Sequence, residues 1–141
     1  MRWILNYKNG KSPCRVNQAS TVLGESIYSF GGYCQQISFT ELKHPNPIDV
    51  HVFNTHTLKW KKRPLPTKDS PQYSQTPYFR YGHACVTYKE FIYLWGGRSD
   101  FTNNLCNTLF CYEPSNESKF ILNFPYLNFL LKLNHSDQWF Y

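Results

Sequence analysis

Charged residues are scarce in this sequence: they make up 17% of its 141 positions, against 41% hydrophobic and 18% aromatic residues. Disordered chains have the opposite composition, because chains with many charges and few aromatic residues cannot bury enough apolar surface to fold. We therefore expect a folded chain. Its length suffices for one modest domain, which would bury about two-thirds of the surface that the unfolded chain exposes.

Long apolar runs are also missing. The longest, over residues 120–133, is interrupted by asparagine, proline and lysine and falls short of the roughly 20 apolar residues that cross a bilayer. The first ten residues hold no apolar core of the kind that a secretory signal peptide carries. These absences argue against both membrane insertion and secretion.

Cysteine and histidine do not occur in metal-binding patterns. None of the five cysteines forms a Cys-x-x-Cys pair, and an odd number without a secretory signal argues for reduced thiols in the cytosol or nucleus. The five histidines are scattered, and His51 and His56 match no usual zinc spacing. We expect no metal, no cofactor, and a cytoplasmic location with the nucleus as a second compartment.

Catalytic patterns are absent as well. The sequence shows no nucleophile paired with a base, no paired carboxylates and no glycine-rich loop that would hold a phosphate. Its nine acidic residues fall in predicted turns and loops. We predict that the chain is not an enzyme and has no catalytic residues.

What the sequence does contain is an internal repeat. Two copies, 65 residues apart, share an arginine, an alanine, a tyrosine and a diglycine: Arg15 and Arg80, Ala19 and Ala84, Tyr28 and Tyr93, Gly31-Gly32 and Gly96-Gly97. Both copies contain Ile-Tyr-x-(Phe or Trp)-Gly-Gly. A repeat of this kind indicates an array of equivalent structural units.

Short segments of β-branched and aromatic residues fill each copy and are bounded by Gly, Asn, Pro or Asp, which is typical of strands. In the first copy they cover residues 19–23, 26–30, 50–53 and 58–60. Amphipathic runs of about ten residues or more, which a helical solenoid needs, are absent. Four short strands with a diglycine fit a β-propeller blade. We therefore predict an all-β fold, a partial propeller of about two four-stranded blades with a divergent C-terminal tail.

The diglycines have a physical role in such a fold. Glycine adopts backbone angles closed to other residues and lets a neighbouring chain approach closely, which is needed where the second strand of a blade ends near the crowded central axis. Gly31, Gly32, Gly96 and Gly97 are therefore predicted structural residues, as is Trp60, the late aromatic of the first copy.

These residues resemble the repeat of the kelch family, whose unit is a diglycine strand, a spacer, an Asn/Asp-hydrophobic-aromatic strand and a late Trp. Residues 28–34, 49–54, 78–84 and 94–98 carry the resemblance, which extends over about residues 1–118. Within the family, the resemblance is to members that serve as substrate receptors of cullin-2 RING ubiquitin ligases and capture the C-terminal residues of proteins. The resemblance implies a protein-binding module for peptide C-termini. It implies a cullin-2 and elongin partner complex only where a longer form supplies the missing C-terminal part.

The repeat and the resemblance divide the chain into five segments. Residues 1–14 are an N-terminal strand that in the family completes the last blade, 15–66 are repeat 1, 67–79 a linker loop, 80–119 an incomplete repeat 2, and 120–141 a divergent tail. The second copy has Lys119-Phe120 where its late Trp is expected, and from Phe120 onward the sequence resembles no kelch strand. We expect that the chain is a truncated product, rather than that residues 120–141 are an extension specific to this protein.

Four residues are candidates for contact with a peptide ligand. The resemblance points to the loops before each repeat and after each diglycine, which hold Arg15 and Arg80 at the repeat starts and Tyr33 and Arg98 directly after the diglycines. Arginine suits this task because its planar fork can hold a carboxylate with two parallel hydrogen bonds. The alternative for the two leading arginines is pairing with acidic groups or carbonyls between blades.

A basic cluster gives the alternative function. Residues 59–63, Lys-Trp-Lys-Lys-Arg, in a chain of net charge +6 could bind nucleic acid or chromatin. Such a run is more often the solvated outer strand of a blade, and a phosphate-binding surface would interleave basic and aromatic residues on several strands. We expect no nucleic-acid partner. A basic chromatin-associated scaffold module and a fragment without independent function are the alternatives.

Overall fold

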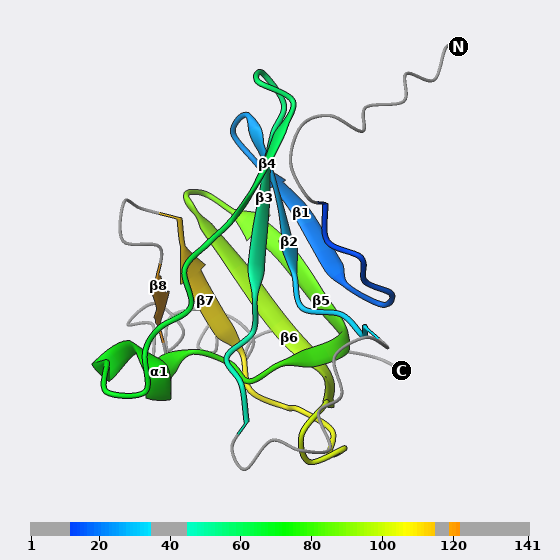
Figure 1. The fold of residues 1–141 in the computed structure, drawn as a ribbon, viewed down its shortest axis with the longest axis vertical. Coiled ribbons are helices and arrows are strands. Elements are labelled where there is room, and N and C mark those ends of the chain that lie inside the picture. Colours follow the sequence, from blue (N-terminus) through cyan, green and yellow to red (C-terminus); the bar gives the residue numbers. More distant parts are fainter. Residues whose placement is uncertain (1–11, 35–44, 115–118, 122–141) are drawn as a thin grey trace, which may run out of the picture.

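The computed structural model describes residues 12–34, 45–114 and 119–121, which form two four-stranded antiparallel sheets. The first sheet contains β1 (Ala19–Leu23), β2 (Ser26–Phe30), β3 (Val50–Asn54) and β4 (Lys59–Lys62). The second contains β5 (Arg80–Tyr88), β6 (Phe91–Ser99), β7 (Phe110–Glu113) and β8 (Lys119–Ile121). In each sheet the strands lie in chain order, as in a propeller blade (Figure 1). The predicted fold class is confirmed.

The two sheets begin with equivalent hairpins. Leu23 pairs with Ser26 across one turn, and Tyr88 pairs with Phe91 across the other, so two residues connect the strands in both. Gly24 has φ +57° and Lys89 has φ +54°. Left-handed residues in a two-residue turn match the right-handed twist of the flanking strands, which explains why both hairpins can be so tight.

The second sheet has its fourth strand, and this corrects the expectation that the sequence from Phe120 onward forms no kelch strand. In β8, Phe120 lies opposite Tyr112 of β7, just as Trp60 of β4 lies opposite Phe53 of β3. The ring centroids are 4.9 Å apart in the Phe120 pair and 5.1 Å apart in the Trp60 pair. Phe120 therefore takes the place of the late Trp, and the boundary expected at residue 119 falls inside β8.

A short helix, α1 (Pro71–Gln75), lies in the segment that was expected to be a linker loop over residues 67–79. The hydroxyl of Ser70 accepts a hydrogen bond from the Gln72 amide at 3.2 Å, and Pro71 stands at the first turn, so the helix has both a cap and a suitable first residue. Figure 1 shows α1 beside β8. No helix among the described residues is long and apolar enough to cross a membrane.

The two sheets pack against each other around one core. Phe30 is completely buried, and its ring lies edge to face against Tyr112 and Phe120, with centroids 5.3 and 6.3 Å away. Hydrogen bonds add to this packing, because the hydroxyls of Thr21 and Thr87 lie 3.0 Å apart. Both sheets contribute to the buried cluster, which consists of Tyr28, Phe30, Ile48, Val50, Val52, Ile92, Leu94, Phe110, Tyr112 and Phe120.

Two expected segments lie largely outside the described residues. These are the N-terminal strand over 1–14, of which only 12–14 are described, and the tail over 120–141, of which only 120–121 are described.

Candidate peptide-binding face

The first diglycine directly follows β2, whereas the second lies within β6, and other backbone comes close to both of them. Gly31 has φ +50°, and a Cβ there would lie 2.6 Å from the carbonyl oxygen of Arg80. Gly97 has φ +84°, and a Cβ there would lie 2.7 Å from the carbonyl oxygen of Tyr81. The Gly32 amide donates to the Arg80 carbonyl at 2.9 Å, which joins the first sheet to the second. Close approach is present at Gly31, Gly32 and Gly97, whereas at Gly96 the nearest atom to a Cβ would be 3.9 Å away.

The residue after each diglycine pairs with the residue after each leading arginine. Tyr33 and Val16 exchange two backbone hydrogen bonds of 3.0 and 2.8 Å, and Arg98 lies opposite Tyr81. Residues directly opposite each other on antiparallel strands share a face. The rings of Tyr33 and Tyr81 meet edge to face with centroids 6.1 Å apart, which brings the two repeats together. We call this surface, made of Val16, Tyr33, Tyr81 and Arg98, the Tyr33–Arg98 face.

The Tyr33–Arg98 face combines accessible apolar surface with a held positive charge. Val16 is 59% exposed and Tyr33 is 42% exposed. Nη1 of Arg98 donates to the Asn103 carbonyl at 2.6 Å and lies 3.3 Å from the Asn103 side-chain oxygen. Both contacts use one terminal nitrogen, and the described part of the chain offers no partner to Nη2. The guanidinium is therefore positioned by its loop and still has a donor for a carboxylate.

The other two candidate residues, Arg15 and Arg80, are held inside the structure. Nη2 of Arg15 lies 2.8 Å from an Asp49 carboxylate oxygen, and its guanidinium stacks on the Phe79 ring at 5.1 Å. Arg80 is 5% exposed and donates to the carbonyls of Tyr78 and Gly96 at 3.1 and 3.3 Å. The partners are an acidic group and carbonyls, as in the pairing alternative, but they do not lie between blades, since Asp49 belongs to the repeat of Arg15 and Gly96 to the repeat of Arg80. A ligand contact by either arginine stays a prediction.

One buried carboxylate, that of Asp49, pairs with Arg15, and two histidines lie near the leading arginines. Asp49 also lies 3.9 Å from His51 and 3.6 Å from Lys62. Burial lowers the pKa of His51, although the charge of Asp49 partly opposes this shift. Burial, together with the charge of Arg80, lowers the pKa of His83 to about 4. His83 is therefore neutral near physiological pH.

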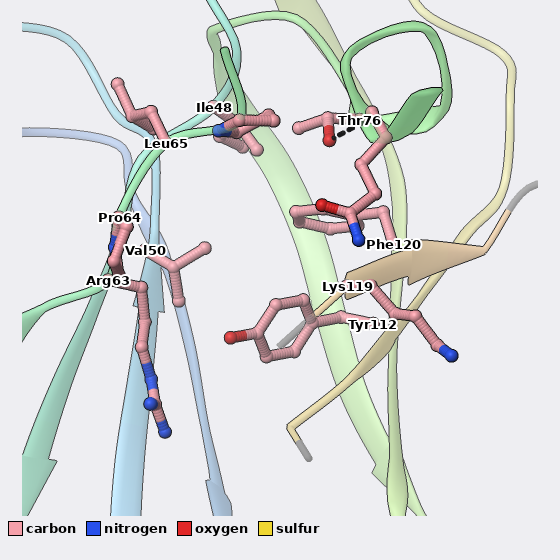
Figure 2. A pocket seen from close by; sticks show the side chains of 11 residues that line it. Ile48, Val50, Arg63, Pro64, Leu65, Thr76, Tyr112, Lys119 and Phe120 are labelled. Carbon is pink, nitrogen blue, oxygen red and sulfur yellow. Dashed lines mark hydrogen bonds between the residues drawn. The ribbon is translucent and has the colours of Figure 1, made fainter. Parts of the chain in front are cut away.

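A pocket of about 180 Å³ lies between the two sheets and α1, as Figure 2 shows. Its lining includes the apolar residues Ile48, Val50 and Phe120 and the charged residues Arg63 and Lys119. Lys119 is also 3.4 Å from the Glu113 carboxylate. The pocket is assembled from segments that are distant in the sequence, so no local pattern could have predicted it.

The basic cluster over residues 59–63 does not form one surface. Lys59, Lys61 and Lys62 are exposed on β4, whereas Trp60 packs against Phe53 and Arg63 lines the pocket. This distribution resembles the solvated outer strand of a blade more than a phosphate-binding surface.

Tyr81 is the residue of the Tyr33–Arg98 face that sequence reasoning missed. It occupies the position that Val16 has in the first repeat, and the repeat gives no reason to single out that position. The pairing of Val16 with Tyr33 and of Tyr81 with Arg98 could have been proposed from the shared offset of 65 residues.

Residues 14–67 match the family model described as Kelch motif. With the two four-stranded sheets and their diglycine strands, this match identifies the chain as a kelch-repeat protein, as its repeat predicted. Kelch repeats typically form protein-interaction modules without catalytic activity.

Among individual proteins, the chain is similar to Kelch domain-containing protein 3. It is 40% identical to the Bos taurus protein over 115 residues, which cover 80% of this chain and 28% of that relative. It is 39% identical to the Homo sapiens protein over 122 residues, which cover 85% of this chain and 30% of that relative. Kelch domain-containing protein 10 of Homo sapiens is 29% identical over 113 residues, or 79% of this chain and 23% of its own length. The chain thus spans less than a third of the curated relatives that it matches.

Proposed function

We propose that this kelch module binds proteins through the Tyr33–Arg98 face and holds the C-terminal end of a peptide there. The observation that carries the proposal is the position of Arg98, opposite Tyr81 and beside the Tyr33–Tyr81 ring pair, with one terminal nitrogen already fixed by Asn103. A carboxylate is one of the groups that an arginine fork holds with two parallel hydrogen bonds, and the C-terminus of a peptide carries one.

The chemistry of the surrounding residues supports this choice of ligand. Tyrosine rings offer large, rigid contact area at a low cost in conformational entropy, so Tyr33 and Tyr81 can flank the last side chains of a peptide. Val16 adds apolar surface next to them. The net charge of +6 also favours the approach of a negatively charged chain end.

The family resemblance and the similarity to Kelch domain-containing protein 3 support a finer proposal. In it, the chain is the N-terminal part of a substrate-recognition subunit of a cullin-2 RING ubiquitin ligase that binds C-terminal degrons. Contact with cullin-2 and elongin is proposed only for a longer form of the protein. We place this activity in the cytoplasm and nucleus, because all five cysteines are free thiols.

Fluorescence anisotropy with pairs of labelled peptides, identical except for a free or an amidated C-terminus, tests the proposal. The free acid should bind more tightly, and Arg98→Ala should remove most of the difference between acid and amide. Loss of a hydrogen bond to a charged group corresponds to roughly a 10- to 100-fold weaker affinity.

Lys61→Ala is the matched control, since it removes one positive charge from the exposed part of β4. It should leave the preference for the free acid unchanged. Equal affinity for acid and amide, or equal losses in the two variants, would contradict the proposal.

A further inference from the structure

The pocket between the two sheets and α1 has a buried floor and an exposed rim. Ile48, Val50 and Phe120 are buried, whereas Pro64 and Leu65 are exposed. The volume of about 180 Å³ is larger than the apolar cavity of about 150 Å³ that accommodates a benzene molecule in an engineered protein core. One aromatic ring therefore fits the pocket and can reach it from solvent past the rim.

Two walls of this pocket are fixed before any ligand arrives. Pro64 and Pro66 restrict the backbone of the segment after β4, because a proline ring fixes the φ angle. α1 supplies another wall, and the hydroxyl of Tyr73 within it donates a hydrogen bond to the Pro45 carbonyl oxygen at 2.8 Å. Fixed walls favour binding, since few protein groups lose conformational freedom when the ligand enters.

The charge on the lining is positive and only partly compensated. Arg63 and Lys119 line the pocket, and no acidic residue is among its lining residues. Lys119 lies 3.4 Å from the Glu113 carboxylate, whereas Arg63 forms no ion pair with any residue that the structure describes. Nε of Arg63 is buried and has no hydrogen-bond partner in the described part of the chain. Because a buried donor without an acceptor costs free energy, the pocket favours a ligand that carries an anionic acceptor.

The apolar and charged groups of the lining lie on two facing sides. Figure 2 shows Val50, Arg63 and Leu65 on one side and Tyr112 and Phe120 on the other. We propose that this pocket binds a small aromatic carboxylate, whose ring packs between Val50 and Phe120 and whose carboxylate accepts hydrogen bonds from the Arg63 guanidinium. Aromatic rings pack well against each other, and charge-assisted hydrogen bonds between arginine and carboxylate are among the strongest in proteins. The pocket shares no residue with the Tyr33–Arg98 face, so this proposal does not rest on the proposed function.

Benzoate is a suitable probe, and titration of the ¹⁵N-labelled full chain measures its binding by nuclear magnetic resonance. Benzoate should bind saturably and shift the amide signals of Val50, Leu65 and Thr76, which line the pocket. Benzyl alcohol has the ring without the charge and should bind roughly 10- to 100-fold more weakly, the loss expected for a hydrogen bond to a charged group. Acetate, which has the charge without the ring, should not shift these signals at the same concentration.

Two matched variants test the role of Arg63. Arg63→Met should weaken benzoate binding by roughly 10- to 100-fold and remove its advantage over benzyl alcohol. Lys61→Met removes the same charge from an exposed position of β4 that does not line the pocket, and it should bind benzoate like the wild type.

Three results would overturn the proposal. One is the absence of saturable benzoate binding by the folded wild-type chain, and another is equal affinity for benzoate and benzyl alcohol. The third is loss of benzoate binding in Arg98→Ala but not in Arg63→Met, which would place the carboxylate on the Tyr33–Arg98 face.

Discussion

Replacing Phe30 with alanine tests whether the two sheets form one folded unit. Phe30 belongs to the first sheet, is completely buried, and lies against Tyr112 and Phe120 of the second. Truncating a buried phenylalanine to alanine costs about 3–5 kcal/mol, from lost transfer free energy and the cavity left behind. Because the free energy of unfolding of a native protein is only about 5–15 kcal/mol, Phe30→Ala should remove a large share of it.

Urea unfolding followed by circular dichroism measures this loss. Leu105→Ala is the control, because Leu105 is 78% exposed and surface substitutions usually change stability by no more than about 0.5 kcal/mol. A loss of less than about 1 kcal/mol for Phe30→Ala would refute the packing of the second sheet over Phe30. Separate unfolding transitions for the two sheets would refute it as well.

Two further predictions concern the diglycine and a buried histidine. Gly31→Ala should lower the urea midpoint of unfolding more than Gly24→Ala. Both glycines have positive φ, +50° and +57°, so an alanine at either position is strained by about 1–2 kcal/mol, but only at Gly31 would its Cβ meet other atoms, 2.6 Å from the Arg80 carbonyl oxygen. Equal shifts of the midpoint in the two variants would contradict this prediction. His83 has a folded pKa of about 4 against an ordinary 6.5, so the unfolded chain binds the proton first and stability falls as pH falls from 6.5 toward 4. His83→Phe should flatten this dependence by up to about 1.4 kcal/mol per pH unit, and an unchanged slope in urea titrations would contradict the buried, neutral state.

The strands and diglycines could be predicted from the sequence because their signals are local. The first sheet was expected over residues 19–23, 26–30, 50–53 and 58–60, and its strands differ from these ranges only at the ends of β3 and β4. A glycine in both copies of a repeat indicates positive φ, and all four residues of the two diglycines have it.

The parts that escaped prediction depend on tertiary contacts or are too short for a periodic signal. β8 has three residues, and Phe120 was recognisable as the late aromatic only once Tyr112 lay opposite it. α1 has five residues, although Ser70 and Pro71 were a usable start signal. Tyr81 joined the candidate site only through its ring contact with Tyr33.

Nuclear magnetic resonance of the ¹⁵N-labelled chain tests whether the Tyr33–Arg98 face binds a peptide C-terminus. Titration with a peptide that has a free C-terminus should shift the amide signals of Tyr33, Tyr81 and Arg98 and leave those of Lys59–Lys62 in place. Amidation of the peptide should weaken the shifts. Shifts confined to β4, or none at all, would contradict binding at the Tyr33–Arg98 face.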